Sequence, residues 1–230
     1  MKFVVANWKM NGDTFLVKKV LDSNFPIDKV EVIICPPYPL ISFFQNRFFK
    51  FGAQDCHTSA SGAYTGNVSA SLLKQLGCSY VIIGHSERRA QHLESNSLIN
   101  QKATQALAQG LTPIVCVGET LQERQEGRVS QVLQNQLDMC LSNIDVSKVI
   151  IAYEPVWAIG TGLVASVADI QEVCHLIQTN YNVVPILYGG SVSQKNAVEI
   201  AAISEISGVL VGGASLKVEE FQTIVDAFKN

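Results

Sequence analysis

The chain has 230 residues, of which 47% are hydrophobic and 16% are charged, and its formal net charge at pH 7 is −3. This composition fits one globular domain over residues 1–230 with a sizeable core. The weak negative charge and the lack of a Lys/Arg-rich block argue against nucleic acid or an anionic membrane surface as a partner.

Short apolar segments recur along the chain and predict eight buried strands. Each has four to six residues and is continuously apolar, as in strands that are covered on both faces. In chain order they are FVVAN from 3, VEVIIC from 30, FGAQD from 51, YVIIG from 80, PIVCV from 113, VIIAY from 149, VPILY from 184 and GVLVG from 208.

Helical patterns lie between these strands. Apolar residues at spacings of three and four predict four helix faces that pack on a core. The gaps around 36–50 and 56–79 have the weakest helical pattern. The predicted faces are Leu98, Ala103, Ala106 and Leu107; Val129, Val132, Leu133, Leu137 and Cys140; Ile170, Val173, Cys174 and Ile177; and Phe221, Ile224, Val225 and Phe228.

The alternation of strands and helices predicts the fold class, a parallel α/β protein with a single (β/α)8 barrel. An open doubly wound sheet is the alternative, but it usually has fewer strands and a glycine fingerprint after the first one. Here ANWKMNG (6–12) follows the first strand, without G-x-G-x-x-G. In such barrels the functional site lies where the strands run into the loops that follow them.

Two of these strand ends carry candidate site residues. Asn7 and Lys9 follow the first strand, where a lysine either binds a substrate or is a solvated loop charge. His85 follows the fourth strand in GHSERR, where we expect the Ser86 hydroxyl to cap a short helix. The positive end of the helix dipole disfavours an imidazolium there, so we expect a neutral histidine that donates a hydrogen bond.

The residues just after His85 have a simpler interpretation. Glu87, Arg88 and Arg89 are most simply explained as structural ion pairs around the histidine.

The sixth strand ends on an acid, Glu154, and a proline follows at once. The residue before a proline is kept extended, so the Glu154 carboxylate is expected to point over the barrel mouth. Four apolar residues in the loop PVWAIGTG (155–162) favour a lid that excludes water. The alternative is a solvated acid at a strand end, followed by an ordinary turn.

Glycine pairs follow the last two strands, in YGGSV (188–192) and LVGGAS (210–215). Glycine lets a ligand approach the backbone, and free N–H groups there can hold a phosphate dianion without a cationic side chain. Phosphate sites of barrels often lie after the seventh and eighth strands. The two pairs therefore predict a phosphate cradle.

A carboxylate, an imidazole, a lysine and a phosphate cradle together favour proton abstraction next to a carbonyl. Glu154 would remove a carbon-bound proton and return it to the neighbouring carbon, while His85 and Lys9 stabilise the enediolate oxygens. That reaction is an aldose–ketose isomerisation. Two alternatives stay open at this point: another phosphate-binding barrel enzyme, of amino-acid biosynthesis, and a barrel that has lost catalysis and serves as a binding protein.

Other patterns bear on cofactors and location. The six cysteines form no C-x-x-C pair and several lie in apolar runs, which predicts reduced, buried thiols in a cytoplasmic protein. The four histidines lack the spacing of a metal site, so we expect no metal and no cofactor. No stretch of about 18 apolar residues that could span a membrane is present.

Seven segments resemble the signatures of the triosephosphate isomerase family, in that family's order. By this resemblance the chain is a TIM-barrel enzyme that interconverts dihydroxyacetone phosphate and D-glyceraldehyde 3-phosphate in glycolysis and gluconeogenesis. This family is itself the standard example of a carboxylate base that works beside a neutral histidine. The segments are NWKMNG (7–12), GAYTG (62–66), GHSERR (84–89), CVGETLQER (116–124), AYEPVWAIGTG (152–162), YGGSV (188–192) and LVGGASL (210–216).

The resemblance also implies roles for single residues. Asn7 and Lys9 match the family's substrate-binding pair, His85 its electrophile and Glu154 its base. The family's phosphate contacts are backbone N–H groups, and the matching positions are Gly160, Ser191 and Gly213, with Gly212 alongside.

Members of the family are typically homodimers, and their third loop reaches into the partner's site. The matching loop is SGAYTGNVS (61–69), and its tip carries Tyr64 and Thr65. The resemblance places Thr65 near the partner's Asn7, whereas the residues alone predict only a surface turn.

Three positions depart from the family's pattern. Asn67 stands where an acid is usual, His92-Leu93 where Phe-Gly is common, and Leu163-Val164 where Lys-Thr is frequent.

Overall fold

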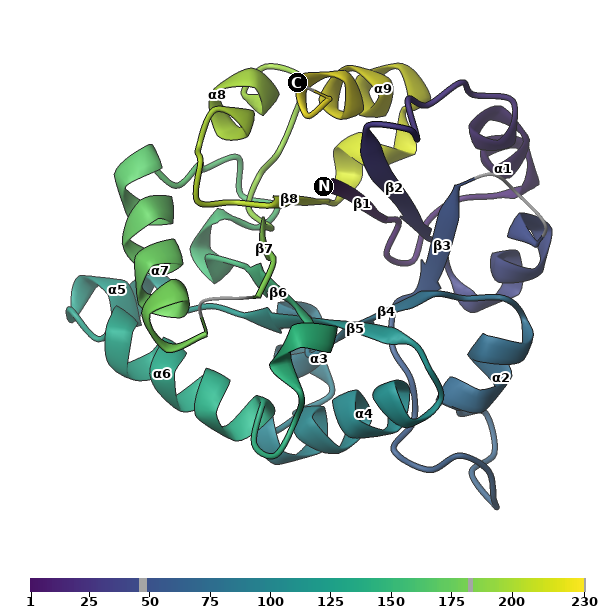
Figure 1. Ribbon diagram of the computed structural model, residues 1–230, viewed down its shortest axis with the longest axis horizontal. Coiled ribbons are helices and arrows are strands. Elements are labelled where there is room, and N and C mark those ends of the chain that lie inside the picture. The colour runs from purple at the N-terminus through teal and green to yellow at the C-terminus, as the bar shows by residue number, and fades with distance from the viewer. Residues whose placement is uncertain (46–48, 182–183, 230) are drawn as a thin grey trace.

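A closed ring of parallel strands forms the centre of the computed structural model, which describes residues 1–45, 49–181 and 184–229 (Figure 1). Within these residues the strands pair in chain order, and β8 pairs with β1 to close the ring. The predicted (β/α)8 barrel is confirmed, and each predicted strand matches an observed one to within two residues at either end. The strands are β1 (Lys2–Asn7), β2 (Val30–Cys35), β3 (Lys50–Ala53), β4 (Tyr80–Ile83), β5 (Thr112–Val117), β6 (Ile150–Tyr153), β7 (Ile186–Tyr188) and β8 (Gly208–Val211).

Helices surround the ring of strands in Figure 1. The two gaps with the weakest helical pattern hold the least regular connections, a 3-10 segment η1 (Tyr38–Phe44) and the short helix α2 (Ala70–Gln75). The other helices of the described residues are α1 (Thr14–Leu21), α3 (Ser86–Gln91), α4 (Asn96–Ala108), α5 (Leu121–Gln125), α6 (Val129–Cys140), α7 (Val167–Asn180), α8 (Ala197–Ala201) and α9 (Val218–Ala227).

Side-chain oxygens cap the start of five of these helices. An oxygen of Asp13, Ser69, Ser95, Thr120 or Ser166 accepts a hydrogen bond from a backbone N–H in the first turn that follows. Such caps satisfy donors that have no partner inside the helix, so they set its first residue.

The strands separate an inner from an outer apolar layer. Side chains such as Val5, Ile114 and Leu210 fill the barrel interior, whereas Val4 and Ala6 point outward. The outward side chains pack against the helices, and this double burial explains why the strand sequences are continuously apolar. The predicted faces of α7 and α9 are buried as expected.

The predicted face of α4 is partly wrong. Leu98 and Leu107 are only half-buried, and Ile99 and Lys102 are buried beside Ala103 and Ala106 instead. Lys102 can be buried because its ammonium group lies 2.7 Å from Asp55 and 2.6 Å from Glu94. A pattern of apolar residues cannot predict such a lysine.

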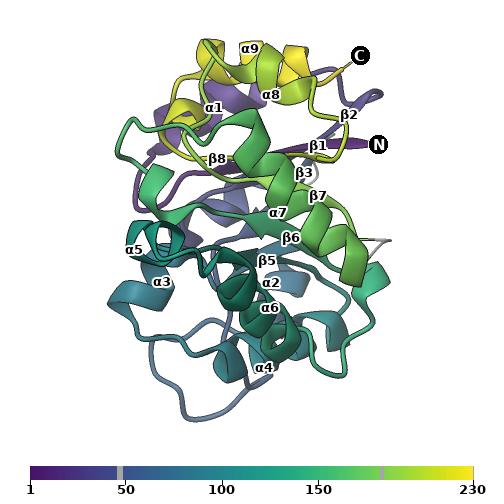
Figure 2. The ribbon, with the colours of Figure 1, turned by 90° about the vertical axis from the view of Figure 1, so that its left-hand side faces the viewer.

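Parallel pairing brings the carboxyl ends of all described strands to one end of the barrel. Figure 2 shows α3 and α5, which follow β4 and β5, at the end opposite to the two chain termini. The six cysteines are free and buried, as predicted from their apolar surroundings. Among the described residues, no helix has the length and apolar character that a membrane span requires.

Candidate active site

A cavity of about 320 Å³ lies at the carboxyl ends of the strands. All eight residues predicted from the sequence line it: Asn7, Lys9, His85, Glu154, Gly160, Ser191, Gly212 and Gly213. We call the part with Lys9, His85 and Glu154 the acid–base end, and the part with Gly160, Ser191, Gly212 and Gly213 the glycine end. The fold therefore joins residues that lie far apart in the chain.

Glu154 directly follows β6 and is only 2% exposed. Its Oε2 accepts a hydrogen bond of 3.0 Å from the Ser86 N–H, and its Oε1 lies 3.0 Å from Nε2 of His85. Burial raises the pKa of Glu154, but His85, the Ser86 N–H and Lys9 outweigh burial and hold that pKa below its ordinary value. The carboxylate is thus ionised and fixed on α3.

Glycine at position 118 makes room for this arrangement. A Cβ on Gly118 would lie 1.7 Å from the carbonyl oxygen of Glu154, a distance that no side chain can tolerate. The N–H of Glu154 donates to the carbonyl of Val117 at 2.7 Å, which holds the two strand ends together.

His85 itself caps α3, so the prediction that Ser86 is the cap is wrong. Nδ1 of His85 accepts a hydrogen bond of 3.2 Å from the Glu87 N–H. Nδ1 therefore carries no hydrogen in this arrangement, and the ring proton lies on Nε2, which faces Glu154. An imidazole nitrogen can replace a hydroxyl oxygen here because both are acceptors within reach of the first helical turn.

Two effects oppose each other in the pKa of His85. Burial lowers this pKa, but the Glu154 carboxylate, with a smaller contribution from Glu87, outweighs burial, so the pKa lies above its ordinary value. The Glu87 N–H acts against protonation of Nδ1, because a hydrogen on that atom would face another hydrogen. The expectation of a neutral histidine therefore depends on where Glu154 lies.

Lys9 has a left-handed backbone conformation with a φ of +53°. Its N–H donates to Oδ1 of Asn7 at 3.0 Å, and its carbonyl accepts from Nε2 of Gln54 at 2.9 Å. Its ammonium group lies 2.6 Å from Oε1 of Glu87. A strained backbone held by neighbouring side chains is typical of functional sites and does not fit a freely solvated loop charge.

The neighbours of His85 differ in their roles. Glu87 forms the predicted ion pair, with Lys9, and Arg88 forms ion pairs with Asp55 at 2.9 Å and Glu94 at 2.6 Å. Arg89 instead donates to main-chain carbonyls, those of Gly84 at 2.8 Å and Cys116 at 2.9 Å. Arg89 of α3 thus joins the residue that follows β4 to β5.

The glycine end offers backbone groups to the cavity. The N–H groups of Gly160, Ser191 and Gly213 donate to no backbone carbonyl of the described residues. A Cβ on Gly213 would meet nothing within 4 Å, and one on Gly212 would lie 3.5 Å from Cε of Lys9. Free N–H groups beside a lysine form a site that can bind an anion.

The expected lid segment is less exposed than the sequence suggests. Val156, Trp157 and Ile159 are half-buried and Ala158 is fully buried, whereas Leu163 and Val164 are exposed. A hydrogen bond also fixes the position of Ala158, because the Ser191 hydroxyl donates to its carbonyl at 2.6 Å. The apolar residues of this loop therefore cover the barrel end.

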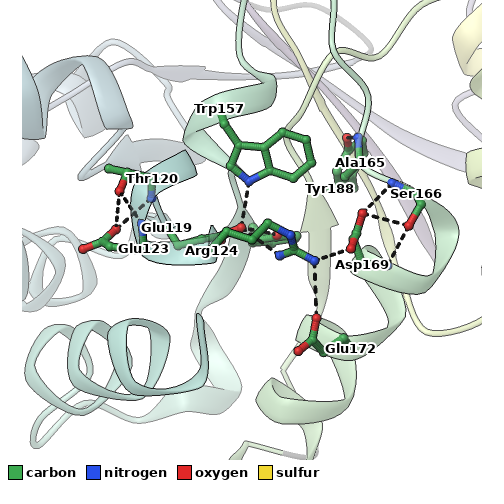
Figure 3. A network of polar contacts seen from close by, with 11 residues as sticks. Glu119, Thr120, Glu123, Arg124, Trp157, Ala165, Ser166, Asp169, Glu172 and Tyr188 are labelled. Carbon is green, nitrogen blue, oxygen red and sulfur yellow. Dashed lines mark hydrogen bonds and ion pairs between the residues drawn. The ribbon is translucent and has the colours of Figure 1, made fainter. Parts of the chain in front are cut away.

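Glu119 anchors the first end of this loop, and the prediction from sequence missed it (Figure 3). Its fully buried Oε1 accepts from Nε1 of Trp157 at 2.8 Å and from the Tyr153 hydroxyl at 3.2 Å, and it pairs with Arg124 at 3.0 Å. The signal available in the sequence is an acid two residues after the apolar run PIVCV, inside the quoted segment CVGETLQER.

Arg124 connects both ends of the loop (Figure 3). Besides Glu119 it pairs with Asp169, whose other oxygen accepts from the N–H and hydroxyl of Ser166. The N–H of Ala165 donates to the Tyr188 hydroxyl at 3.3 Å. The two ends of the segment are thus fixed, while Leu163 and Val164 between them stay exposed.

Comparisons with known proteins identify the family of the chain. A family model described as triosephosphate isomerase matches residues 2–228. The chain is 43% identical to triosephosphate isomerase of Herminiimonas arsenicoxydans, over 98% of each protein. It is 45% identical to that of Dehalococcoides mccartyi (strain CBDB1), over 96% of this chain and 94% of the relative.

A solved structure gives the same result. The crystal structure of triosephosphate isomerase from Bartonella henselae matches with a TM-score of 0.90 at 38% identity, over 100% of this chain and 99% of that chain. Both the sequence and the fold thus agree over nearly the full length. The chain therefore belongs to the triosephosphate isomerase family, and it is an isomerase with a TIM-barrel fold.

Proposed function

We propose that this isomerase interconverts dihydroxyacetone phosphate and D-glyceraldehyde 3-phosphate through an enediolate, with Glu154 as the base and His85 as the electrophile. The observation that carries the proposal is the acid–base end, where Oε1 of Glu154 lies 3.0 Å from Nε2 of His85 in a cavity that ends in free backbone N–H groups. Membership of the family supports this substrate and a role in glycolysis and gluconeogenesis.

The reaction moves protons within one molecule. Glu154 takes a proton from the carbon next to the carbonyl, and the electron pair of that C–H bond forms the enediolate. The Nε2–H of His85 and the ammonium group of Lys9 stabilise the two oxygens, and Asn7 helps to bind the substrate. His85 gives its Nε2 proton to the original carbonyl oxygen and takes the proton of the original hydroxyl group, and Glu154 returns the carbon-bound proton to the neighbouring carbon. Nothing is oxidised overall, so the step needs no cofactor.

The contacts of Glu154 suggest how the base is activated. In the present arrangement the Ser86 N–H and His85 hold its carboxylate and lower its pKa, which makes it a weak base. A substrate oxygen that takes the Nε2–H of His85 would displace the carboxylate toward the substrate carbon. Burial would then dominate and raise the pKa of Glu154, as the proton transfer requires.

The glycine end would hold the phosphate group. The N–H groups of Gly160, Ser191 and Gly213 are available for its oxygens, with Gly212 alongside, and Lys9 is next to them. Closure of the lid segment 155–162 over the cavity would exclude water. A dry, clamped enediolate loses phosphate by elimination less readily.

We also propose a cytoplasmic homodimer of single-domain chains. The loop 61–69 projects away from the barrel in Figures 1 and 2, and Tyr64 near its tip is 46% exposed. A groove of about 670 Å³ next to Asn7 and Lys9, lined in part by Met10 and Tyr38, is the surface that the loop of a second copy would fill. The six reduced cysteines fit the cytoplasm.

An assay of the purified protein tests the reaction. Conversion of glyceraldehyde 3-phosphate is followed through a reporter dehydrogenase, with a chelator present, and the same reaction in D2O is followed by NMR. Rapid turnover with deuterium on the carbon that receives the proton is the expected result. A folded sample without turnover would contradict the proposed reaction and leave the binding-protein alternative.

Sedimentation velocity tests the dimer separately. We expect wild type to sediment as a dimer and Thr65→Arg as a monomer, because a charged side chain at the loop tip cannot enter the groove beside Lys9 and Arg88. Ser204→Arg, on the exposed surface near the amino end of the barrel, is the matched control and stays dimeric. A dimeric Thr65→Arg protein would contradict the role given to this loop.

A further inference from the structure

Two charged side chains at the glycine end have no role in the proposed mechanism. Lys217 and Glu220 line the same cavity as Gly212 and Gly213. Lys217 follows directly after the 3-10 segment η4 (Gly213–Leu216), and Glu220 lies in the first turn of α9. The ammonium group of Lys217 lies 2.8 Å from Oε1 of Glu220.

Glu220 is the unexpected member of this pair. A carboxylate at the mouth of a phosphate site repels a dianion, so on its own Glu220 would weaken substrate binding. The charged side chains that line the cavity are two cations, Lys9 and Lys217, and two carboxylates, Glu154 and Glu220. The ammonium group of Lys9 is already paired with Glu87, at 2.6 Å, so Lys217 is the cation that neutralises Glu220.

Lys217 is free to move. Its side chain is 69% exposed, against 26% for that of Glu220. A lysine carries three rotatable donors on a flexible chain, and an exposed ion pair of this kind is weak, so the ammonium group can change partners at little cost. The loop before it is rigid by comparison, because both the N–H and the hydroxyl of Ser215 donate to the carbonyl of Gly212, at 2.9 and 2.7 Å.

We infer that Lys217 is a further phosphate-binding residue, and that Glu220 holds it beside the glycine end until the phosphate group of the substrate takes its place. This inference rests on the proposed function, because it needs a phosphate at the glycine end. Glu220 then acts as a competitor for Lys217 and sets how tightly phosphate binds, while the backbone N–H groups set where it binds.

The test measures the inhibition constant of inorganic phosphate, as a competitor of the substrate, at low ionic strength. We compare wild type, Lys217→Met, Glu220→Gln and the variant with both changes. Loss of the ammonium group is expected to raise the constant about fivefold, and loss of the carboxylate to lower it about twofold, as for single exposed charges. Lys217→Arg keeps the charge and is expected to stay close to wild type.

The double variant separates binding from mere charge neutralisation. If Lys217 contacts phosphate, adding Lys217→Met to Glu220→Gln raises the inhibition constant about fivefold again. If Lys217 only neutralises Glu220, the double variant and Glu220→Gln have equal constants, and the inference is overturned. The Lys217 side chain is exposed and that of Glu220 is partly exposed, and circular dichroism tests that each variant is folded.

Lys229→Met is the matched control. Its ammonium group lies 2.8 Å from Asp226 near the far end of α9, so the variant loses the same charge from a similar ion pair away from the cavity. We expect its inhibition constant to equal that of wild type, and a rise like that of Lys217→Met would overturn the inference by pointing to net charge alone. Wild type that turns over substrate but is not inhibited competitively by phosphate would instead contradict the phosphate site itself.

Discussion

The two ends of the cavity are built in different ways. The acid–base end depends on side chains, and each is held by specific partners: Glu154 by the Ser86 N–H, and His85 by the Glu87 N–H. The glycine end depends on the backbone, and its N–H groups have no backbone partner in the described part of the chain. One end thus fixes which atoms react, and the other leaves donors free for a ligand.

This difference predicts two kinds of sensitivity to substitution. At the acid–base end, a side chain of the same shape but different proton affinity should abolish the chemistry and leave binding intact. At the glycine end, any added side chain occupies space that the ligand needs, so binding should weaken while the chemistry of the bound substrate remains. The first two predictions below test this separation.

The largest effect is expected for Glu154→Gln. Glutamine has the shape of glutamate but cannot accept the proton, so kcat should fall about 10³-fold, within the range of general-base catalysis. The inhibition constant of inorganic phosphate should change little, because the glycine end is untouched. Steady-state kinetics with phosphate as the competitor measure both quantities.

Glu199→Gln is the control for that variant, since Glu199 is an exposed carboxylate on α8. It should behave as wild type in both measurements. If Glu154→Gln kept wild-type turnover, Glu154 would not be the base. If it lost phosphate binding as well, the two ends of the cavity would not be independent.

The next largest effect is expected at Gly213. Gly213 lines the cavity, and a Cβ on it would meet no protein atom within 4 Å, so we expect an added side chain to take up space that the ligand needs. Losing one hydrogen bond to a charged group costs about 2 kcal/mol, which corresponds to a roughly 30-fold weaker affinity. We therefore expect Gly213→Val to raise KM by that factor, and Gly213→Ala to raise it less. A drop in kcat with unchanged KM would show that this position serves the chemistry instead.

A smaller effect is expected in the titration of His85. Burial lowers the pKa of His85, whereas the Glu154 carboxylate raises it, with a smaller contribution from Glu87. In Glu154→Gln burial outweighs the remaining attraction of Glu87, so the pKa should fall below its ordinary value and the ring should stay neutral with its proton on Nε2. Nitrogen-15 NMR measures directly the tautomer of the His85 ring and the midpoint of its pH titration. An unchanged midpoint would mean that the carboxylate is not the cause.

The sequence predicts much of this architecture because its signals are local. Most strands are apolar runs, and strand ends mark where Lys9, His85 and Glu154 lie. The barrel then brings these ends together by topology alone. Glycines after β7 and β8 are equally local signals, because a backbone that must approach a ligand closely excludes side chains.

The features that were missed depend on contacts between distant parts of the chain. Arg124 reaches Asp169 and Glu119 reaches Trp157, pairs that are 45 and 38 residues apart in sequence. Lys102 is buried only because Asp55 and Glu94 neutralise it. Propensities and periodicity describe one segment at a time, so they cannot predict partners of this kind.

The smallest effect concerns a backbone conformation that favours glycine but holds another residue. Leu93 has a φ of +54° and is 84% exposed, so it carries left-handed strain without any burial to offset it. Such strain costs about 1–2 kcal/mol in a residue other than glycine. Glycine removes this strain, but it also increases the conformational entropy of the unfolded chain, which offsets part of the gain in stability. Leu93→Gly should therefore stabilise the fold by about 0.5–1 kcal/mol and raise Tm by roughly 1–4 °C.

Leu163→Gly is the matched control, because Leu163 is also exposed, at 53%, but is not among the described residues with positive φ. It lacks that strain, so only the entropic cost of glycine applies and its Tm should not rise. A Tm for Leu93→Gly at or below that of wild type would mean that Leu93 makes a contact in solution, such as one with a second copy of the chain, that outweighs the strain of its backbone.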